Sequence, residues 1–206
     1  GMKCFPLARS CLELSMLMPT LPSDAYPLDP DGDGANPLEF FCDMEPPNPG
    51  WTQVFIDALD PAPIMGAWDP VVTGECGDSG AILGPYGMGG ALALDITAQK
   101  VPHTELKGGV DAVIMDSWDA IDDDRILIKL DGAEIFTQSC DSQSDFTCGQ
   151  VMNLCSDPLF NDSVLPIATA PFAHDADPIA LEFSSVLSEP VANESWGLDK
   201  VVVFVK

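Results

Sequence analysis

The chain has 206 residues, of which 33 are acidic and only 8 are Lys or Arg, so its formal net charge at pH 7 is -25. Such a charge repels phosphate backbones and anionic lipid surfaces, which excludes nucleic acid as a partner class. Hydrophobic residues make up 46% of the sequence, enough to bury a core and too many for a disordered acidic tail. No apolar run reaches about 18 residues, so we expect no insertion into a membrane.

The seven cysteines, with 19 prolines and 17 glycines, favour an oxidising compartment. Neither a C-x-x-C pair nor a cluster of His and Cys offers zinc a site, so the cysteines predict disulfides in a secreted or cell-surface protein. The count is odd. Cys4, the cysteine nearest the start of the chain, is the expected free thiol.

The first predicted elements are a short helix and a β-hairpin. Ser10 and Glu13 form the S-x-x-E pattern of a capping box, and Pro19 ends the apolar run that follows them. Strands are then predicted over residues 26–28 and 38–44, on either side of an acidic, glycine-rich turn.

The order of these elements resembles the opening subdomain of fibrinogen-related domains. In that family a cysteine in a short helix precedes a glycine-bearing hairpin, C-D-M and G-G-G-W-T; here Cys11 is followed by SDAYPLDPDGDGANPLEFFCDM and then by GWT. The match covers about residues 11–54. It implies that Cys11 pairs with Cys42, closing a loop of about 30 residues that stabilises the fold by roughly 3–4 kcal/mol. The rest of the chain lacks the family's tryptophan-rich body, so the family's ligand pocket and calcium site are not carried over.

The turn sequence DPDGDG has two interpretations. It offers Asp29, Asp31 and Asp33 at alternate positions with a glycine sixth, as an EF-hand calcium loop does. The twelfth position, however, is Phe40, where such a loop requires a bidentate Glu. In the second interpretation Pro30 and the glycines supply the turn dihedrals, and the aspartates cap backbone N–H groups. Given the family resemblance, we favour the turn.

The remainder of the chain is predicted to be β-structure. The clearest hairpin joins RILIKL (125–130) to AEIFTQ (133–138) through the two-residue turn Asp131-Gly132. Many short strands separated by turns indicate a sandwich or jelly roll. Further strands are predicted over residues 53–59, 90–96, 112–116, 179–186 and 201–205.

The expected architecture is therefore all-β. It consists of a small fibrinogen-like subdomain of helix and hairpin over residues 1–58 and a jelly-roll-like β-sandwich over residues 59–206. Residues 140–171 are predicted to be a long irregular excursion, which needs tethering. We expect the excursion's three cysteines and one earlier cysteine to form two disulfides, with three connectivities open. These cysteines are Cys76, Cys140, Cys148 and Cys155.

Two related motifs mark the sandwich, DSWD at residues 116–119 and NESWGLDK at residues 193–200. Together with ILGPYG, PH and the hairpin around LDGAEIF, they resemble a jelly-roll module found in extracellular proteins of bacteria and ciliates. The match covers roughly residues 82–205. What the resemblance implies is an extracellular location rather than a defined ligand.

The two motifs also place acids at strand ends, where loops can gather them around a calcium ion. These acids are Asp116, Asp119, Glu194 and Asp199. A formal charge of -25 needs compensation, and calcium outside the cell is the predicted cofactor. In the alternative interpretation the acids cap turns while Trp118 and Trp196 plug the ends of the sandwich. Both interpretations remain open at this point.

One motif suggests an enzyme. Residues 77–80 read GDSG, the sequence around the nucleophile of chymotrypsin-like proteases. Those proteases place their histidine before the serine, whereas His103 and His174 both follow Ser79. A different fold can still assemble Ser79 with either histidine, because triads are recognised by geometry. We nevertheless expect Ser79 to do no chemistry and His103 to be a satisfied core or loop histidine.

The expected function is binding or adhesion outside the cell, without catalysis. The partner would be a glycan or a cell-surface glycoprotein, and the chain can belong to a larger protein with other domains. Trp68, in a Pro-rich loop, is the tryptophan expected to be exposed and to stack on sugar rings. Two alternatives stay open: a secreted glycosidase or esterase built on the same sandwich, and a structural spacer of a larger surface protein.

Overall fold

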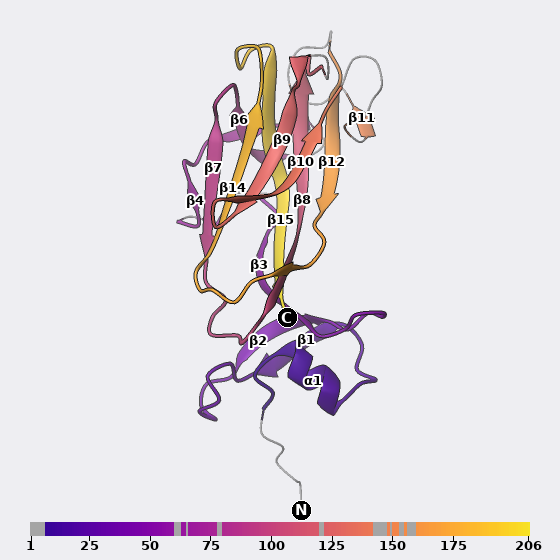
Figure 1. Ribbon diagram of the computed structural model, residues 1–206, viewed down its shortest axis with the longest axis vertical. Coiled ribbons are helices and arrows are strands. Elements are labelled where there is room, and N and C mark those ends of the chain that lie inside the picture. The colour runs from indigo at the N-terminus through magenta and orange to yellow at the C-terminus, as the bar shows by residue number, and fades with distance from the viewer. Residues whose placement is uncertain are drawn as a thin grey trace, which may run out of the picture.

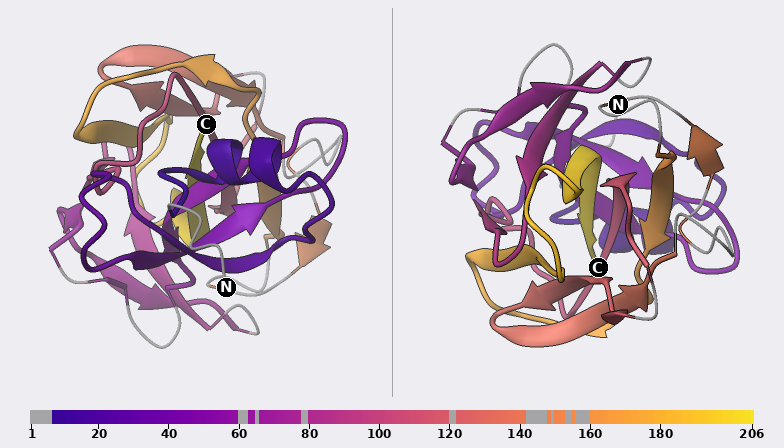
Figure 2. Two further views of the ribbon diagram at one scale, coloured as in Figure 1. Left: turned by 90° about the horizontal axis from the view of Figure 1, so that it is seen from below. Right: turned by 90° about the horizontal axis from the view of Figure 1, so that it is seen from above.

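A computed structural model of the protein describes residues 7–59, 63–64, 66–77, 80–119, 122–141, 148, 150–152, 155 and 160–206. Two antiparallel sheets face one another in a β-sandwich, and a smaller subdomain containing one short helix lies across one end of it (Figures 1 and 2). The expected all-β sandwich is therefore confirmed. The helix has seven residues, and no described helix has the length and apolarity needed to cross a membrane.

The helix α1 (Cys11–Leu17) begins as predicted, because the side chain of Ser10 accepts a hydrogen bond from the backbone N–H of Glu13 at 3.2 Å. The Glu13 carboxylate accepts from the N–H of Arg9 at 2.8 Å, one residue before the position expected in a capping box. The predicted hairpin follows as the antiparallel strands β1 (Asp24–Leu28) and β2 (Leu38–Asp43).

The larger sheet joins the N-terminal subdomain to the sandwich. Strand β3 (Trp51–Asp57) pairs with β2 at one end and with the last strand, β15 (Glu194–Val205), along most of its length. The remaining strands of this sheet are β8 (Glu105–Asp116), β12 (Asp162–Ala168) and β11 (Gln150–Met152) on the main path, with β5 (Thr73–Glu75), β6 (Ala81–Tyr86) and β13 (Phe172–Ala173) off it.

The second sheet contains the predicted Asp131-Gly132 hairpin. Both turn residues have positive φ values, 50° and 79°, as a type I′ turn requires. The turn joins β9 (Arg125–Leu130) to β10 (Ala133–Ser139), so this hairpin is confirmed. The other strands of the sheet are β14 (Ile179–Val186), β7 (Ala91–Ile96) and β4 (Trp68–Asp69).

The core lies between the two sheets. Side chains of β9 and β14 alternate between buried and partly exposed positions, as strands with one face on a core do. Trp118 and Trp196 are fully buried. The indole N–H of Trp118 donates to the carbonyl of Ser195 at 2.9 Å, and the Trp196 ring lies 4.9 Å from that of Tyr86. Both tryptophans are therefore part of the buried core of the sandwich.

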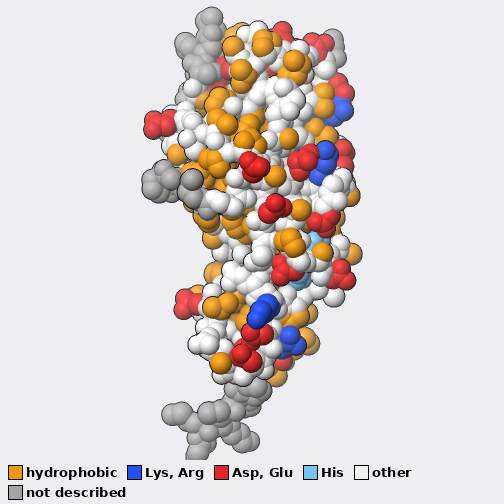
Figure 3. All heavy atoms as spheres, turned by 90° about the vertical axis from the view of Figure 1, so that its left-hand side faces the viewer, with side chains coloured by type: hydrophobic (Ala, Val, Ile, Leu, Met, Phe, Trp, Pro, Cys, Tyr) orange, Lys and Arg blue, Asp and Glu red, His pale blue; other side chains and the backbone are white. Residues whose placement is uncertain are grey.

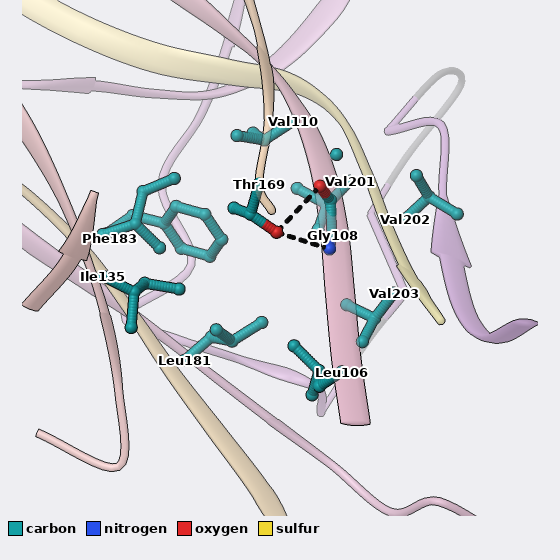
Figure 4. A pocket seen from close by; sticks show the side chains of 12 residues that line it. Leu106, Gly108, Val110, Ile135, Thr169, Leu181, Phe183, Val201, Val202 and Val203 are labelled. Carbon is teal, nitrogen blue, oxygen red and sulfur yellow. Dashed lines mark hydrogen bonds between the residues drawn. The ribbon is translucent and has the colours of Figure 1, made fainter. Parts of the chain in front are cut away.

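One small hollow remains between the sheets (Figure 4). Gly108 occupies the inward-facing position between Leu106 and Val110 on β8 and has no side chain to fill the space. The Thr169 hydroxyl accepts from the Gly108 N–H at 2.8 Å. With a volume of about 20 Å³ the hollow has room for about one water molecule, so it is a gap in the packing and not a ligand site.

The prediction that residues 140–171 are irregular is wrong for β11 and, over a longer stretch, for β12. Its burial alternates as a strand requires, but Pro166 made the sequence look unlike one. On the side away from β8, strand β11 pairs only with residues 162–164. Pro166 therefore lies where β12 is an edge, and its missing N–H removes no ladder hydrogen bond.

Three disulfides are present. Cys11 bonds to Cys42, as the resemblance implied, and ties α1 to β2. Cys76 bonds to Cys155 and Cys140 to Cys148, which confirms two further disulfides and selects one of the three connectivities. Cys4, the predicted free thiol, lies outside the described residues. Three disulfides are typical of proteins that fold in an oxidising compartment.

Candidate functional site

A pocket of about 310 Å³ opens where the turn of the first hairpin meets the segment that joins β7 to β8. We call it the polar pocket. Its volume is at the lower end of the range for small-molecule sites. It is lined by two carboxylates, two amides, a lysine and two apolar side chains: Asp29, Asp31, Asn36, Gln99, Lys100, Pro30 and Leu38.

The hairpin turn forms one wall of the polar pocket, and its aspartates cap backbone groups. Oδ2 of the buried Asp29 accepts from the N–H of Gly34 at 2.8 Å, and Oδ1 of Asp33 accepts from the N–H of Ala35 at 2.7 Å. Gly32 and Gly34 have φ values of 72° and 77°, which glycine adopts without strain. Asp29 and Asp33 therefore cap backbone groups of the turn, as the second interpretation of DPDGDG expects.

Gln99 and Lys100 form the opposite wall, on the segment between β7 and β8. Nζ of Lys100 lies 3.0 Å from Oδ2 of Asp31, so this ion pair joins the sandwich to the hairpin turn. The hydrogen bond from Lys100, followed by that from the Asp33 N–H, holds the pKa of Asp31 below its ordinary value. Asp31 is therefore ionised at neutral pH. Acidic side chains greatly outnumber basic ones on the face shown in Figure 3.

The same turn brings three carboxylates together. One ligand oxygen from each of Asp29, Asp31 and Asp33 lies within 4.8 Å of the others. Phe40, at the position where an EF-hand needs its bidentate Glu, is buried on β2. Any cation held here would therefore be bound by the turn alone and not by an EF-hand loop.

Two of the four predicted metal ligands are neighbours, and among the described residues no three of the four form a cluster that could hold an ion. Glu194 and Asp116 are partners across the β15–β8 pair, and both are buried. Asp119 lies just beyond the end of β8. Asp199 lies five residues further along β15, roughly 16 Å away at the rise of a strand.

Glu194 has a closer acidic partner, Asp124, which sequence reasoning missed. Asp124 is fully buried; Oδ2 accepts from the N–H of Asp119 at 2.8 Å, and Oδ1 has no hydrogen-bond donor. Burial raises the pKa of Glu194 to about 7, and burial also raises the pKa of Asp124. Each of the two carboxyl groups therefore keeps its proton to a higher pH than a solvated carboxyl group does. In the sequence, Asp124 is hidden in a run of three aspartates.

The prediction that Trp68 is an exposed stacking residue is wrong. Only 4% of Trp68 is exposed, because it is a strand residue of β4 that packs into the core. Its indole N–H donates to Oδ2 of Asp57 at 2.9 Å, and Phe55 packs edge-on against the ring. The other three tryptophans are also buried, so the chain offers no tryptophan platform for a sugar ring.

The proposed enzymatic motif cannot be placed, because Ser79 lies outside the described residues. His103 is a satisfied loop histidine as expected, since its Nδ1 lies 2.9 Å from the carbonyl oxygen of Val101. The sequence did not predict that its other ring nitrogen contacts His174.

A second hollow, of about 520 Å³, lies on the N-terminal subdomain between α1 and β1. Its walls are almost entirely apolar, and the hydroxyl of Tyr26 donates to the carbonyl of Pro22 at 2.8 Å. It therefore offers few hydrogen bonds to a polar ligand. The lining residues are Leu7, Ala8, Leu14, Leu17, Met18, Leu21, Tyr26 and Pro27.

Comparisons of the sequence with protein-family models and with curated proteins give no match. Among solved structures, the chain is similar to the CBM36-1 domain of a multidomain xylanase from the hindgut metagenome of Trinervitermes trinervoides. The identity is 10% and the TM-score 0.43, over 72% of this chain and 94% of that one. It is similar to the CBM22-1 xylan-binding domain from Paenibacillus barcinonensis, with 12% identity and a TM-score of 0.39 over 75% and 95%.

A third similar structure is an exo-beta-1,3-galactanase from Phanerochaete chrysosporium. It is 14% identical, with a TM-score of 0.37 over 81% of this chain. The chain spans 37% of the length of that enzyme.

Proposed function

We propose that the protein is a secreted or cell-surface binding module that takes a glycan or a glycoprotein in the polar pocket and performs no catalysis. The observation that carries this proposal is the chemistry of the pocket walls. Asn36 and Gln99 each offer donors and an acceptor, Asp31 offers acceptors and Lys100 offers donors. Sugar hydroxyls both donate and accept hydrogen bonds, so such a mixed wall suits them.

The proposed location, outside the cell or on its surface, is supported by the three disulfides. Leu38, which is 44% exposed, adds an apolar contact at the rim of the pocket, where the face of a sugar ring can pack.

A glycan array with the intact protein tests the ligand class. Lys100→Met is expected to lower the affinity for the glycan about tenfold or more, because a hydrogen bond from the charged Lys100 to the glycan contributes about 1.5–3 kcal/mol. Lys129→Met is a matched control, since Lys129 also pairs with an acid, Glu182, but on the second sheet.

Two results contradict the proposal. The first is an array without any bound glycan, which favours the structural spacer. The second is an equal loss of affinity in Lys100→Met and Lys129→Met, which would mean that glycan binding depends on the net charge of the protein and not on the polar pocket. A secreted hydrolase is tested separately, with a panel of glycosidase and esterase substrates.

We further propose that calcium stabilises the module through Asp29, Asp31 and Asp33, whose oxygens already lie within 4.8 Å of one another. At millimolar calcium, a site of extracellular affinity adds about 1–2 kcal/mol to the free energy of unfolding. The melting temperature should therefore be higher in calcium than in EDTA at matched ionic strength.

Asp33→Asn is expected to remove this calcium effect, whereas Glu194→Gln should keep it. The opposite result would mean that calcium binds near Glu194, at the end of the sandwich that carries the DSWD motif, and not at the hairpin turn. Coincident melts of the unmodified protein in calcium and EDTA would show that the aspartates are turn caps only.

A further inference from the structure

The motif NESWGLDK begins with three residues that the proposed function does not use. Residues 193–195 (NES) have the pattern Asn-x-Ser in which x is not proline, and this pattern accepts N-linked glycans in secreted proteins. Residues 161–163 (NDS) have the same pattern. We call both acceptor motifs. The pattern is short, so the place of each asparagine in the fold decides whether it can carry a sugar.

Asn193 is exposed at the end of a tight turn that leads into β15. Its N–H donates to the carbonyl of Pro190 at 2.8 Å. Its own carbonyl oxygen accepts from the N–H and from the hydroxyl of Ser117, at 2.9 and 2.8 Å. The backbone of Asn193 is therefore fixed by the fold, and its side chain is at the surface.

The atom of Asn193 to which a sugar would be attached is Nδ2. This atom donates a hydrogen bond to Oε2 of the exposed Glu189 at 3.0 Å. An amide nitrogen carries two hydrogens, and a glycosylated one keeps one of them. Attachment of a sugar is therefore compatible with the hydrogen bond to Glu189.

We propose that Asn193 is a site of N-glycosylation. The donor class is an oligosaccharide linked to a polyprenyl diphosphate. Nδ2 forms a bond to the anomeric carbon of the first sugar, the bond from this carbon to the diphosphate breaks, the diphosphate leaves with the electron pair, and Nδ2 releases one proton. The proposal rests on the proposed location outside the cell and not on the proposed ligand.

Ser195 determines when the sugar must be attached. The transferring enzyme has to reach the hydroxyl that completes the acceptor motif. In the folded protein Ser195 is 2% exposed, and its carbonyl oxygen accepts the indole N–H of Trp118 at 2.9 Å. The fold therefore hides the serine of the motif, so the sugar must be attached before β15 pairs with β8.

The second acceptor motif lies on the other side of β8 and is less suited to carry a glycan. Strands β12 and β15 both pair with β8, and Asn161 directly precedes β12. Asn161 is half-buried. The next residue, Asp162, is 1% exposed and accepts from the N–H of Cys155 at 2.6 Å. A glycan on Asn161 would start from a partly covered position, so Asn161 serves as the internal comparison.

Asn193 lies at the end of the sandwich away from the N-terminal subdomain (Figure 1). Strand β15 has 12 residues between this end and the subdomain, a length of roughly 35 Å at the rise of a strand. The polar pocket lies beside the subdomain, so a glycan on Asn193 leaves it open. Exposed apolar side chains lie near Asn193, and a solubilising glycan suits them. They are Met88, Val186 and Val191.

Mass spectrometry of the full chain, made in a eukaryotic cell line behind a cleavable export signal, tests the site. Enzymatic release of N-linked glycans in ¹⁸O water converts each glycosylated asparagine into a labelled aspartate, which reads the two acceptor motifs separately. We expect the label at Asn193 in most molecules. Asn193→Gln and Ser195→Ala should each lower the mass of the chain by that of one glycan. Ser195→Thr should keep this mass, because threonine also completes the motif.

Secreted and retained chains are analysed together, because attachment precedes folding and a variant that folds poorly is still a valid sample. An unlabelled Asn193 in the unmodified chain, a label on Asn161 alone, or a label at Asn193 that persists in Ser195→Ala would overturn the proposal. Secretion of an unlabelled chain with its disulfides formed would refute the modification and leave the proposed location standing. An empty glycan array would refute the proposed ligand and leave the label at Asn193 as measured.

Discussion

The free energy of unfolding is expected to fall by about 2.5 kcal/mol as pH rises from about 5 to about 8, because the pKa of Glu194 is raised from 4.5 to about 7 in the folded protein. Burial is the main cause; the charge of Asp124 adds to it, and the N–H groups of Glu189 and Ser188 oppose it. Between the two pKa values the folded protein binds a proton that the unfolded chain has released. This contribution of Glu194 to stability is therefore largest below pH 4.5, falls as pH rises through about 7 and is absent above it.

Denaturant titrations at several pH values, at constant ionic strength and in EDTA, measure this slope. Glu194→Gln should flatten it, because the amide oxygen still accepts from Ser188 and Glu189 while its NH₂ group can donate to Asp124. Asp122→Asn removes one exposed charge from the same region and serves as the control. A slope that survives in Glu194→Gln would assign the pH dependence to the general charge of the protein.

Replacing Cys11 and Cys42 together by Ala is expected to lower the free energy of unfolding by about 3–4 kcal/mol, since their disulfide closes a loop of 31 residues. Both cysteines are fully buried between α1 and β2, and the Cys11 N–H donates to the hydroxyl of Thr52 on β3 at 3.0 Å. The loss should be concentrated in the N-terminal subdomain, because β3 also pairs with β15 and stays attached to the sandwich.

Denaturation followed by hydrogen exchange measures both the size and the place of this loss. The double Ala variant of Cys140 and Cys148 is the comparison, because that disulfide closes a loop of only 8 residues and should cost about 2.5 kcal/mol. Equal losses in the two variants, or unchanged exchange in α1, β1 and β2, would contradict the loop-length explanation.

The sequence determined the features that depend on neighbouring residues. Ser10 caps α1, the aspartates of DPDGDG cap their own turn, and Asp131-Gly132 forms a tight hairpin. In each case the hydrogen bond or dihedral angle that forms the feature involves residues within about five positions of one another. The local sequence is therefore sufficient to predict it. Binary alternation likewise predicted β9 and β14 with the bounds observed.

Only the tertiary structure decided which distant side chains meet. Trp68 is buried where Asp57 accepts its N–H and Phe55 packs on it, Asp124 meets Glu194, which is 70 residues away in the sequence, and His103 contacts His174. The polar pocket lies where Lys100 meets Asp31, residues that are 69 positions apart. With 33 acids in the chain, spacing alone cannot select the few that become buried. Burial follows from how the two sheets pack, and it is burial that changes a carboxyl from a solvated charge into a proton-binding group.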